Sequence, residues 1–574
     1  MKSVQTSEKP LNLIIDKDRS KGLYLVDFDY RQNDPRVAIG STWIAEDSRF
    51  NRKFLMRVVD LGYHTDYDQD RIIKTVREQS KAQFKERDYD YYCRETAWMR
   101  LEGEIKNNSL QDVFDQPTVL RTSLRPTTPQ DDLIIAAPDT TNGFPIGNLR
   151  SGGRDLEPIV TLEDRFVGFR TLICGTSGFG KSTLVRNIAR YWLEQDKYGV
   201  IIDDLKGEYV FDIKNERGQA VPGLSNHPNA QKKLVLLTPF PRRYEGDARL
   251  NNVKIVSLEI NIDDIPPESL SDVATNITPA QRSFLEFYSE KRNLFSLLLR
   301  NNSDGSTKVD DWYQHFKGFI IALKAARKEV VKDGYETDLN DFERSSYIPI
   351  FGVRKHLKGL EGMPFVKTDG PSCIPKIHKF LKSGATIILD KRGLSDSQKM
   401  VVSTVLANEL YRHNAMYSAG TPDEQEANVI PFVYLVEEAH LMLSRQQASE
   451  GSVFVNFAKT GRSFQIGLIA VTQRPSSIDT NILSQFDNFV TFRLTNEQDV
   501  KDLLKAKSDF RGYEEEIRTM QRGMAVTAFG EPTKVQSIKG FSWTSERAST
   551  LLSEHEYQLL QSQHKYIETT YDTE

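Results

Sequence analysis

One short segment of the chain has the residue types and the spacing that hold a polyphosphate. Residues 175–182 read GTSGFGKS, which fits the pattern G-x-x-x-x-G-K-[ST]. Glycines permit a tight turn whose N–H groups converge on phosphate oxygens at the amino end of a helix. Lys181 can then reach the β- and γ-phosphates, and the Ser182 hydroxyl can bind Mg²⁺. The predicted nucleotide-binding residues are Gly175, Thr176, Ser177, Gly178, Phe179, Gly180, Lys181, Ser182 and Thr183.

Two adjacent carboxylates follow an apolar run farther along the chain. Residues 432–436 (FVYLV) predict a buried strand, and Glu437 and Glu438 come directly after it. A nucleoside triphosphatase needs one acidic group for Mg²⁺ and another that polarises the attacking water. The order of the pair assigns the metal to Glu437, together with Ser182, and the general-base role to Glu438.

Two more polar residues end predicted strands. Asp203 closes the run 198–203, and Gln473 follows the run 466–472. Ligands of an open parallel sheet bind at the carboxyl ends of its strands. We therefore expect Asp203 near the nucleotide and Gln473 at the γ-phosphate or the attacking water. An aspartate that only caps a turn is the alternative for Asp203.

The elements that must position these residues alternate along the chain as parallel βαβ units do. Leu184, Ile188 and Trp192 lie on one face of a predicted helix after the phosphate loop, and Ser395 with Gln398 forms a capping box that opens another helix. The sequence therefore predicts an α/β fold. Its strands are expected at 171–174, 198–203, 233–238, 385–390, 432–436, 466–472 and 489–494.

The amino-terminal part reads differently. Apolar runs at 35–44, 54–63 and 133–137 are separated by turn residues and predict short strands of a small barrel or sandwich, whereas the charged stretch 70–108 predicts a solvated helix. Thr278-Pro279 predicts the start of a helix in a mostly helical insertion. The expected domains are 1–155 (barrel), 156–262 and 378–545 (two parts of the core), 263–377 (insertion) and 546–574 (tail).

Composition excludes several classes of protein. The chain has 574 residues, and its 76 Lys and Arg against 80 Asp and Glu leave a net charge of −4, which argues against a protein that coats nucleic acid. Basic residues confined to a channel remain compatible with this balance. The three cysteines are far apart, and no run of 18 uncharged apolar residues occurs. We expect a cytoplasmic protein without a membrane span or disulfides.

Several strings in this order resemble the HerA branch of the HerA–FtsK ATPases: GTSGFGKST, IIDDLKGEY, LVEEAHLML, GRSFQIGLIAVTQRPSSID and LSQFDNFVTFRLTNEQD. The resemblance implies ATP and Mg²⁺ as cofactors and a homo-hexamer that moves along double-stranded DNA. It also implies a RecA-like core, an amino-terminal β-barrel and an inserted helical bundle. Arg462 would be the arginine finger of a neighbouring subunit, and Arg170 a second arginine on the nucleotide side. The implied catalytic residues are Lys181, Glu438, Arg462 and Gln473.

The same resemblance implies partners. HerA proteins work with the nuclease NurA in end resection, or with a sirtuin-like NAD-hydrolysing or nuclease-like effector in antiphage defence. Lys206, Lys391 and Arg392 are candidates for DNA contacts in a central pore. Two other readings stay open at this point. The chain could be an ATP-regulated ring scaffold for an effector enzyme, or a conjugation or secretion ATPase.

Overall fold

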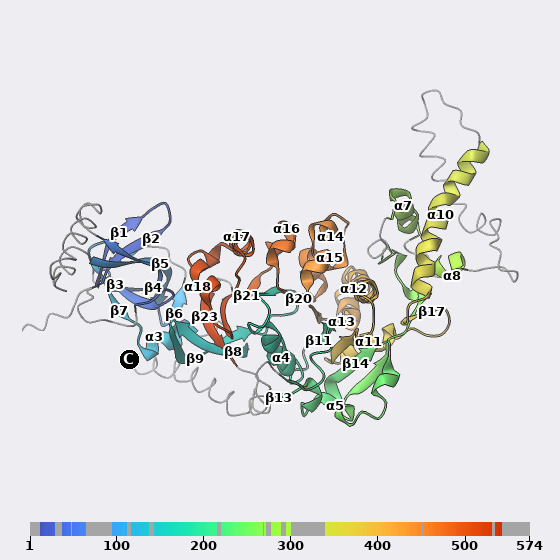
Figure 1. The fold of residues 1–574 in the computed structure, drawn as a ribbon, viewed down its shortest axis with the longest axis horizontal. Coiled ribbons are helices and arrows are strands. Elements are labelled where there is room, and N and C mark those ends of the chain that lie inside the picture. Colours follow the sequence, from blue (N-terminus) through green and yellow to red (C-terminus); the bar gives the residue numbers. More distant parts are fainter. Residues whose placement is uncertain are drawn as a thin grey trace, which may run out of the picture.

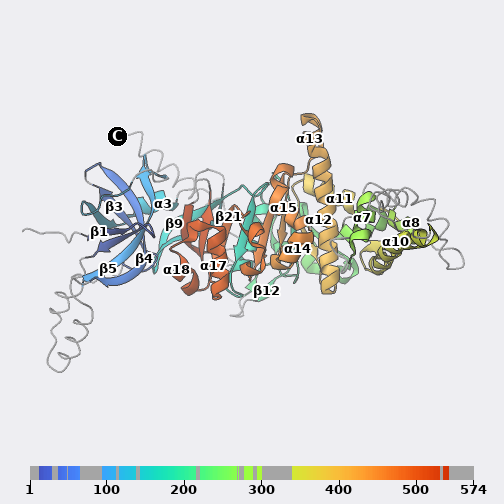
Figure 2. The same ribbon diagram turned by 90° about the horizontal axis from the view of Figure 1, so that it is seen from above.

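The computed structural model describes residues 12–28, 37–47, 49–64, 94–111, 116–136, 143–214, 220–267, 269–270, 277–288, 294–299, 339–450, 452–530 and 534–541. The predicted tail, 546–574, and residues 70–93 of the charged stretch lie outside these ranges. Three parts follow one another along the molecule: a barrel at one end, a large sheet with helices, and a helical insertion at the other end (Figure 1). The same order is seen from above in Figure 2.

The amino-terminal part is a small closed β-barrel, as predicted. Six strands pair in the order β2-β1-β7-β3-β4-β5, β5 closes on β2, and β6 extends β5. Its interior is apolar, with Ile14, Trp43 and Phe54 at most 1% exposed. The strands are β1 (Asn12–Asp18), β2 (Leu23–Asp27), β3 (Thr42–Asp47), β4 (Arg52–His64), β5 (Arg94–Lys106), β6 (Ser109–Gln111) and β7 (Thr122–Pro126).

Two predictions for this part are wrong. The run 133–137 is predicted as a strand, but its residues up to Ala136 belong to the helix α3 (Pro129–Ala136). The backbone N–H and the hydroxyl of Thr128 both donate to the Asp131 carboxylate, at 2.8 and 2.6 Å, which caps the first turn and overrides the β-propensity of the isoleucines. Residues 94–106 of the charged stretch form β5, because alternate apolar residues such as Ala97 and Met99 enter the barrel core.

The central sheet confirms the α/β prediction. Its order is β15-β14-β18-β11-β19-β20-β10-β21-β22-β23-β8-β9; the strands from β15 to β21 are parallel and the last four join antiparallel. The strands are β8 (Gly143–Ser151), β9 (Arg154–Glu163), β10 (Arg170–Cys174), β11 (Gly199–Asp204), β14 (Leu234–Thr238), β15 (Lys254–Ser257), β18 (Thr386–Asp390), β19 (Phe432–Val436), β20 (Ile466–Thr472), β21 (Asn488–Phe492), β22 (Met524–Phe529) and β23 (Lys534–Gly540). Every predicted core strand is present, within two residues at each end.

The expected domain boundary at residue 155 falls inside β9. The hairpin β8–β9 extends the central sheet through pairing between β8 and β23, so these strands do not belong to the barrel. Short strands with similar apolar patterns look alike in sequence, and only the pairing partner distinguishes the two sheets.

Helices cover both faces of the sheet. Figure 1 shows α4 on one side of the sheet and α12 and α15 on the other. The neighbouring residues Leu172 and Ile173 of β10 pack against these two sides, Leu172 with residues of α12 and α15 and Ile173 with residues of α4. The predicted capping box of α12 is present: Ser395 Oγ accepts the Gln398 N–H at 3.3 Å, and the Gln398 side chain accepts the Ser395 N–H at 3.0 Å. The core helices are α4 (Lys181–Trp192), α5 (Ala230–Lys233), α11 (Ile374–Lys382), α12 (Asp396–Ser418), α13 (Pro422–Asn428), α14 (Arg445–Glu450), α15 (Val453–Thr460), α16 (Thr480–Leu483), α17 (Glu497–Ala506) and α18 (Glu514–Thr519).

The insertion is mostly helical in its described residues, and Thr278 caps the helix α7 through a capping box with Gln281, as the Thr278-Pro279 start predicts. Its helices are α7 (Pro279–Phe287), α8 (Leu294–Leu299) and α10 (Leu339–Glu361), and the short pairs β12 (Ile213–Lys214) with β13 (Ala220–Val221) and β16 (Ile260–Asn261) with β17 (Val366–Lys367) lie outside the main sheet. None of the described helices has the length and apolarity to cross a bilayer.

Candidate nucleotide site

The phosphate loop joins β10 to α4, the arrangement that the sequence predicts. Gly175, Gly178 and Gly180 have φ angles of 146°, 78° and 126°, in a region that side chains with a Cβ rarely adopt. A Cβ on Gly175 would lie 2.5 Å from Cβ of Phe492. The loop therefore needs its glycines for both conformation and space.

The lysine of the loop folds back onto it. Lys181 Nζ donates to the carbonyl oxygens of Gly175 and Thr176, at 2.6 and 3.0 Å. Burial lowers the pKa of this ammonium, and the carboxylates of Glu437 and Glu438 act in the opposite direction. The charge is held at the amino end of α4, where a phosphate group would meet it.

A cavity of about 650 Å³ lies beside the loop. The structure brings residues 177–183 together there with Glu437, Glu438 and Gln473, which come from the ends of β19 and β20. Gly175 and Thr176 lie at the base of the loop, outside the cavity wall. Residues far apart in sequence thus share one wall because the carboxyl ends of neighbouring parallel strands meet at one edge.

Glu438 has an unusual backbone conformation. Its φ and ψ are 48° and 44°, a left-handed conformation that costs a non-glycine residue about 1 kcal/mol or more. Gln473 Nε2 donates to Glu438 Oε1 at 2.8 Å, and His440 Nδ1 lies 3.5 Å from Oε2. The strained backbone and these contacts aim the carboxylate across the end of β20.

Glu437 is held by a tyrosine. The Tyr209 hydroxyl donates to Glu437 Oε1 at 2.5 Å. Burial, followed by the charge of Asp204, raises the pKa of Glu437 to about 8. A cation placed beside this carboxyl group would stabilise its ionised form.

The donor set fits Mg²⁺ bound together with a nucleotide. The Ser182 hydroxyl and the Glu437 carboxylate both lie on the cavity wall, and hard oxygen donors are the ligands that Mg²⁺ prefers. Within the described ranges no three His, Cys, Asp or Glu side chains form a metal cluster. Mg²⁺ bound with a nucleotide would take its remaining ligands from phosphates and water. When bound, Mg²⁺ would neutralise charge on the β- and γ-phosphates.

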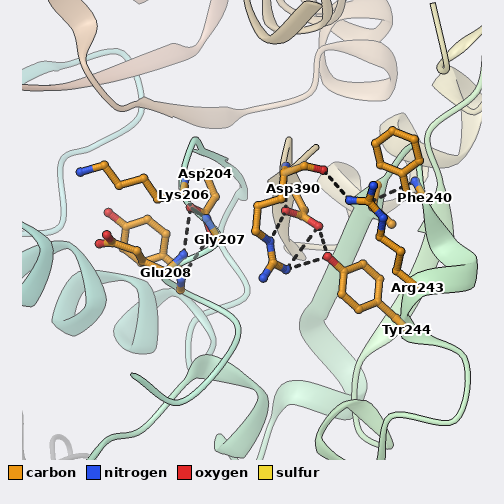
Figure 3. Close-up of polar contacts among 11 residues, drawn as sticks. Asp204, Lys206, Gly207, Glu208, Phe240, Arg243, Tyr244 and Asp390 are labelled. Atoms are coloured by element: carbon orange, nitrogen blue, oxygen red, sulfur yellow. Dashed lines mark hydrogen bonds and ion pairs between the residues drawn. The ribbon is translucent and has the colours of Figure 1, made fainter. Parts of the chain in front are cut away.

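The loop after β11 is organised by Asp204, which sequence reasoning passed over in favour of Asp203. Asp204 Oδ1 accepts the backbone N–H groups of residues 206–208 at 2.7–3.2 Å, and Oδ2 accepts that of Tyr209 at 3.3 Å (Figure 3). This turn puts Lys206 and Glu208 on the cavity wall. Two aspartates followed by a glycine three residues on are a turn signal that could have been read from the sequence.

The structure does not bring Asp203 to the cavity. Successive strand residues point to opposite faces, and Asp203 pairs with the ammonium of Lys391, with both side chains 1% exposed. Lys391 also donates to Ser403 Oγ at 2.7 Å. The prediction that Lys391 contacts DNA is therefore wrong, because a buried ammonium cannot meet a phosphate in a pore.

Arg392, the neighbouring pore candidate, is only one-third exposed. Its Nε donates to Asp390 Oδ1 at 2.8 Å and its Nη2 to the Tyr244 hydroxyl at 2.7 Å (Figure 3). The Arg392 carbonyl accepts a hydrogen bond from Arg243 in turn, at 3.0 Å. The Arg392 guanidinium is therefore occupied by its hydrogen bonds to Asp390 and Tyr244.

Arg462 and Arg170 lie at the opposite edge of the sheet from the cavity. Arg462 is exposed in the short helix η7 (Gly461–Phe464), before the amino end of β20, and its guanidinium lies 5.2 Å from the centre of the Phe169 ring. Arg170 opens β10 and holds Asp487 through two bonds of 2.9 and 3.0 Å. Neither side chain lines the cavity of its own chain.

Sequence reasoning missed one wall of the cavity. Arg522 and Gly523 before β22, the end of β23 with Phe541, and Ile146 in β8 complete it. No local pattern marks these residues, because they reach the cavity only through the antiparallel strands that extend the sheet beyond β21.

A parallel sheet with a phosphate loop after one strand, and two carboxylates and a glutamine after its neighbours, defines a P-loop nucleoside triphosphatase. Residues 144–410 match the family described as "Helicase HerA, central domain". This part of the chain, a little under half of its length, is therefore similar to the central domain of HerA helicases.

Two relatives of known name are also helicases. A DNA double-strand break repair helicase HerA of Pyrococcus furiosus is 24% identical over 475 residues, which cover 77% of this chain and 76% of that protein. A probable helicase of Methanocaldococcus jannaschii is 22% identical over 358 residues, or 59% of each chain.

Solved structures are more distant. VirB4 of Thermoanaerobacter pseudethanolicus is 14% identical with a TM-score of 0.42, covering 71% of this chain and 98% of that one. The plasmid coupling protein TrwB with an ATP analogue is 13% identical with a TM-score of 0.44, covering 72% and 92%.

Proposed function

We propose that this chain is an ATP-driven motor that moves on double-stranded DNA as a homo-hexamer. One observation carries the proposal: the phosphate loop, Glu438 and Gln473 share a single cavity, while Arg462 is exposed at the opposite edge of the sheet. A ring of identical subunits would bring the Arg462 edge of one protomer to the cavity of the next. The names of the HerA relatives support DNA as the polymer.

The residues of the chain divide the work of hydrolysis. The loop N–H groups and Lys181 would hold the β- and γ-phosphates, and Ser182 with Glu437 would hold Mg²⁺. Glu438 would accept a proton from the water that attacks the γ-phosphorus, while the bond to the β-phosphate oxygen breaks and ADP leaves. Gln473, which donates to Glu438, would orient that water.

Arg462 of the neighbouring protomer would stabilise charge on the transferred phosphoryl group, since a guanidinium is planar and permanently charged. Hydrolysis in this arrangement requires two protomers, so it would respond to movement between them. Such a requirement links each ATP turnover to a shift of subunits around bound DNA.

An effector enzyme would complete the system. The family resemblance supports a sirtuin-like NAD hydrolase or a nuclease as the partner, in antiphage defence, and we place this assembly in the cytoplasm with ATP and DNA. End resection with a NurA-type nuclease is the alternative within the same family. Mixing the purified ring with a candidate effector and following co-migration on a sizing column tests this part of the proposal.

The motor itself is tested by following displacement of a third strand from a DNA triplex, with wild-type protein and with Glu438→Gln. Wild-type protein with ATP should displace the strand, and the variant should bind ATP without displacement. If an attached effector stays fully active with Glu438→Gln and wild-type protein displaces nothing, the chain is an ATP-regulated scaffold instead.

A further inference from the structure

Part of the cavity wall is apolar. Ile146, Val221, Ile538 and Phe541 line the cavity, and they come from β8, β13 and β23 and the residue after it. Each of these side chains is at most 7% exposed. An apolar wall of this kind suits the flat, apolar faces of a nucleobase.

One polar side chain on the cavity wall has an unused acceptor. Asn187, on α4, lines the cavity and is 1% exposed. It lies four residues after Thr183, which also lines the cavity, so both project from one face of the helix. Among the described residues, none donates to Asn187 Oδ1.

The orientation of the Asn187 amide follows from its neighbour. Nδ2 lies 3.5 Å from the carbonyl oxygen of Phe541, which can only accept a hydrogen bond. Turning the amide round would put two acceptors together, so Nδ2 faces Phe541. Oδ1 is then left without a donor among the described residues. The Phe541 N–H donates to the Ile146 carbonyl oxygen at 3.3 Å. This hydrogen bond holds the end of β23 beside the Asn187 side chain.

We propose that Asn187 Oδ1 reads the exocyclic amine of adenine. This inference rests on the proposed function, since it requires a nucleotide in the cavity. The N6 amine of adenine is a donor, whereas guanine and hypoxanthine carry an acceptor oxygen at the same position. A buried acceptor left without a donor costs about 1–3 kcal/mol, so a base that brings a donor is preferred to one that brings an acceptor.

Lys539 is one donor on the cavity wall that would favour guanine instead. Its ammonium already donates to the Arg522 carbonyl at 2.9 Å, and the side chain is only partly buried. Asn187 is 1% exposed, so a hydrogen bond between its Oδ1 and a base would form where water is excluded. We therefore expect Asn187 to decide the choice of base.

The test compares equilibrium binding of ATP, purine riboside triphosphate and ITP to the full chain, with Mg²⁺ and in a Glu438→Gln background that prevents hydrolysis. Purine riboside lacks the amine, and ITP replaces it with oxygen. ATP should bind about tenfold more tightly than purine riboside triphosphate, the value of one hydrogen bond of about 1.4 kcal/mol, and ITP should bind more weakly still.

Asn187→Leu should weaken ATP to about the level of purine riboside triphosphate, leave that analogue unchanged, and remove the additional penalty on ITP. Asn456→Leu on α15, outside the cavity, should change nothing. Equal binding of the three nucleotides to the chain that keeps Asn187 overturns the inference. An equal loss of affinity for all three nucleotides in Asn187→Leu overturns it as well. Binding of none of them contradicts the proposed function as well. The analogue series needs no Asn187 variant, so it decides even if Asn187→Leu does not fold.

Discussion

The ammonium of Lys391 and the carboxylate of Asp203 form an ion pair in the interior of the sheet, with each side chain 1% exposed. Asp203 belongs to β11 and Lys391 follows β18, so the pair joins two neighbouring parallel strands at their carboxyl ends. It lies directly behind Asp204, which orders the loop on the cavity wall. The pair thus supports the edge of the sheet on which the nucleotide residues stand.

Removing one partner of this pair should destabilise the fold strongly. Lys391→Met leaves the Asp203 carboxylate buried without a cation, which typically costs about 3–5 kcal/mol. The free energy of unfolding from urea titration measures this loss. Lys399→Met, which removes an ion pair with the fully exposed Asp396, is the matched control and should cost less than about 1 kcal/mol. Equal losses in the two variants would contradict the structural role of the buried pair.

Glu438→Gln should separate hydrolysis from binding. Loss of the general base should reduce turnover by about 10²–10⁴-fold while ATP affinity stays within a few-fold of wild type. Steady-state phosphate release and equilibrium nucleotide binding measure the two effects. Glu426→Gln, an exposed glutamate of α13, should leave both unchanged. Wild-type turnover in Glu438→Gln would remove this carboxylate from the mechanism.

Arg462→Ala should abolish turnover through the neighbouring protomer. A finger that stabilises the transferred phosphoryl group is worth about 10³–10⁵-fold in rate, and nucleotide binding by the chain's own loop should persist. Lys181→Ala, which lacks the loop lysine, should also be inactive.

Mixing these two inactive variants supplies the control for Arg462. Mixed oligomers contain intact loops from Arg462→Ala beside intact fingers from Lys181→Ala, so part of the ATPase activity should return. Absence of any recovery in oligomers shown to exchange subunits would mean that Arg462 does not act between protomers.

The barrel should depend on Arg57 for its attachment to the core. The guanidinium of Arg57, in β4, donates to Glu516 of α18 and Ser537 of β23, and it lies 4.1 Å from the centre of the Tyr513 ring. It is 2% exposed. Arg57→Met should lower the free energy of unfolding by about 3–5 kcal/mol, because Glu516 is left buried and unpaired.

The double variant Arg57→Met with Glu516→Met should recover much of that loss, since no unpaired charge remains. Lys501→Met, which breaks the exposed pair with Glu497 on α17, should cost less than about 1 kcal/mol. A double variant that is no more stable than Arg57→Met would show that the ion pair is not the source of the loss. Chemical denaturation followed by tryptophan fluorescence measures all four chains.

A half-buried histidine, His378, should make stability depend on pH. Burial, together with the neighbouring His413 ring 4.3 Å away, lowers the pKa of His378 to about 4, against about 6.5 in an unfolded chain. The unfolded chain therefore binds the proton first. The contribution is complete above pH 6.5 and is lost as the pH falls towards 4.

Unfolding free energies of wild type and His378→Gln, measured between pH 4 and 7, test this dependence. The carboxyl groups titrate equally in both chains, so the difference between the two curves reports His378. The loss on acidification should be smaller in His378→Gln. Parallel curves for the two chains would show that His378 is protonated equally easily in the folded and unfolded states.

Local patterns were enough to predict much of this protein. The phosphate loop, the strand before Glu437 and the capping box at Ser395 are each encoded within a few consecutive residues. Their signals are turn geometry, apolar periodicity and side-chain caps, which act over one or two turns of chain. The same local reasoning erred at α3, where the cap at Thr128 outweighs a β-branched run.

Only the tertiary structure decided which of these residues meet. Asp203 and Asp204 are adjacent, yet the alternation of a strand sends one into a buried pair and the other into the loop of the nucleotide site. Phe541 reaches Asn187 across 354 residues because β23 adds to the sheet beside β8. Strand order and the sides to which side chains point depend on long-range packing, and no neighbouring residues in the sequence carry that information.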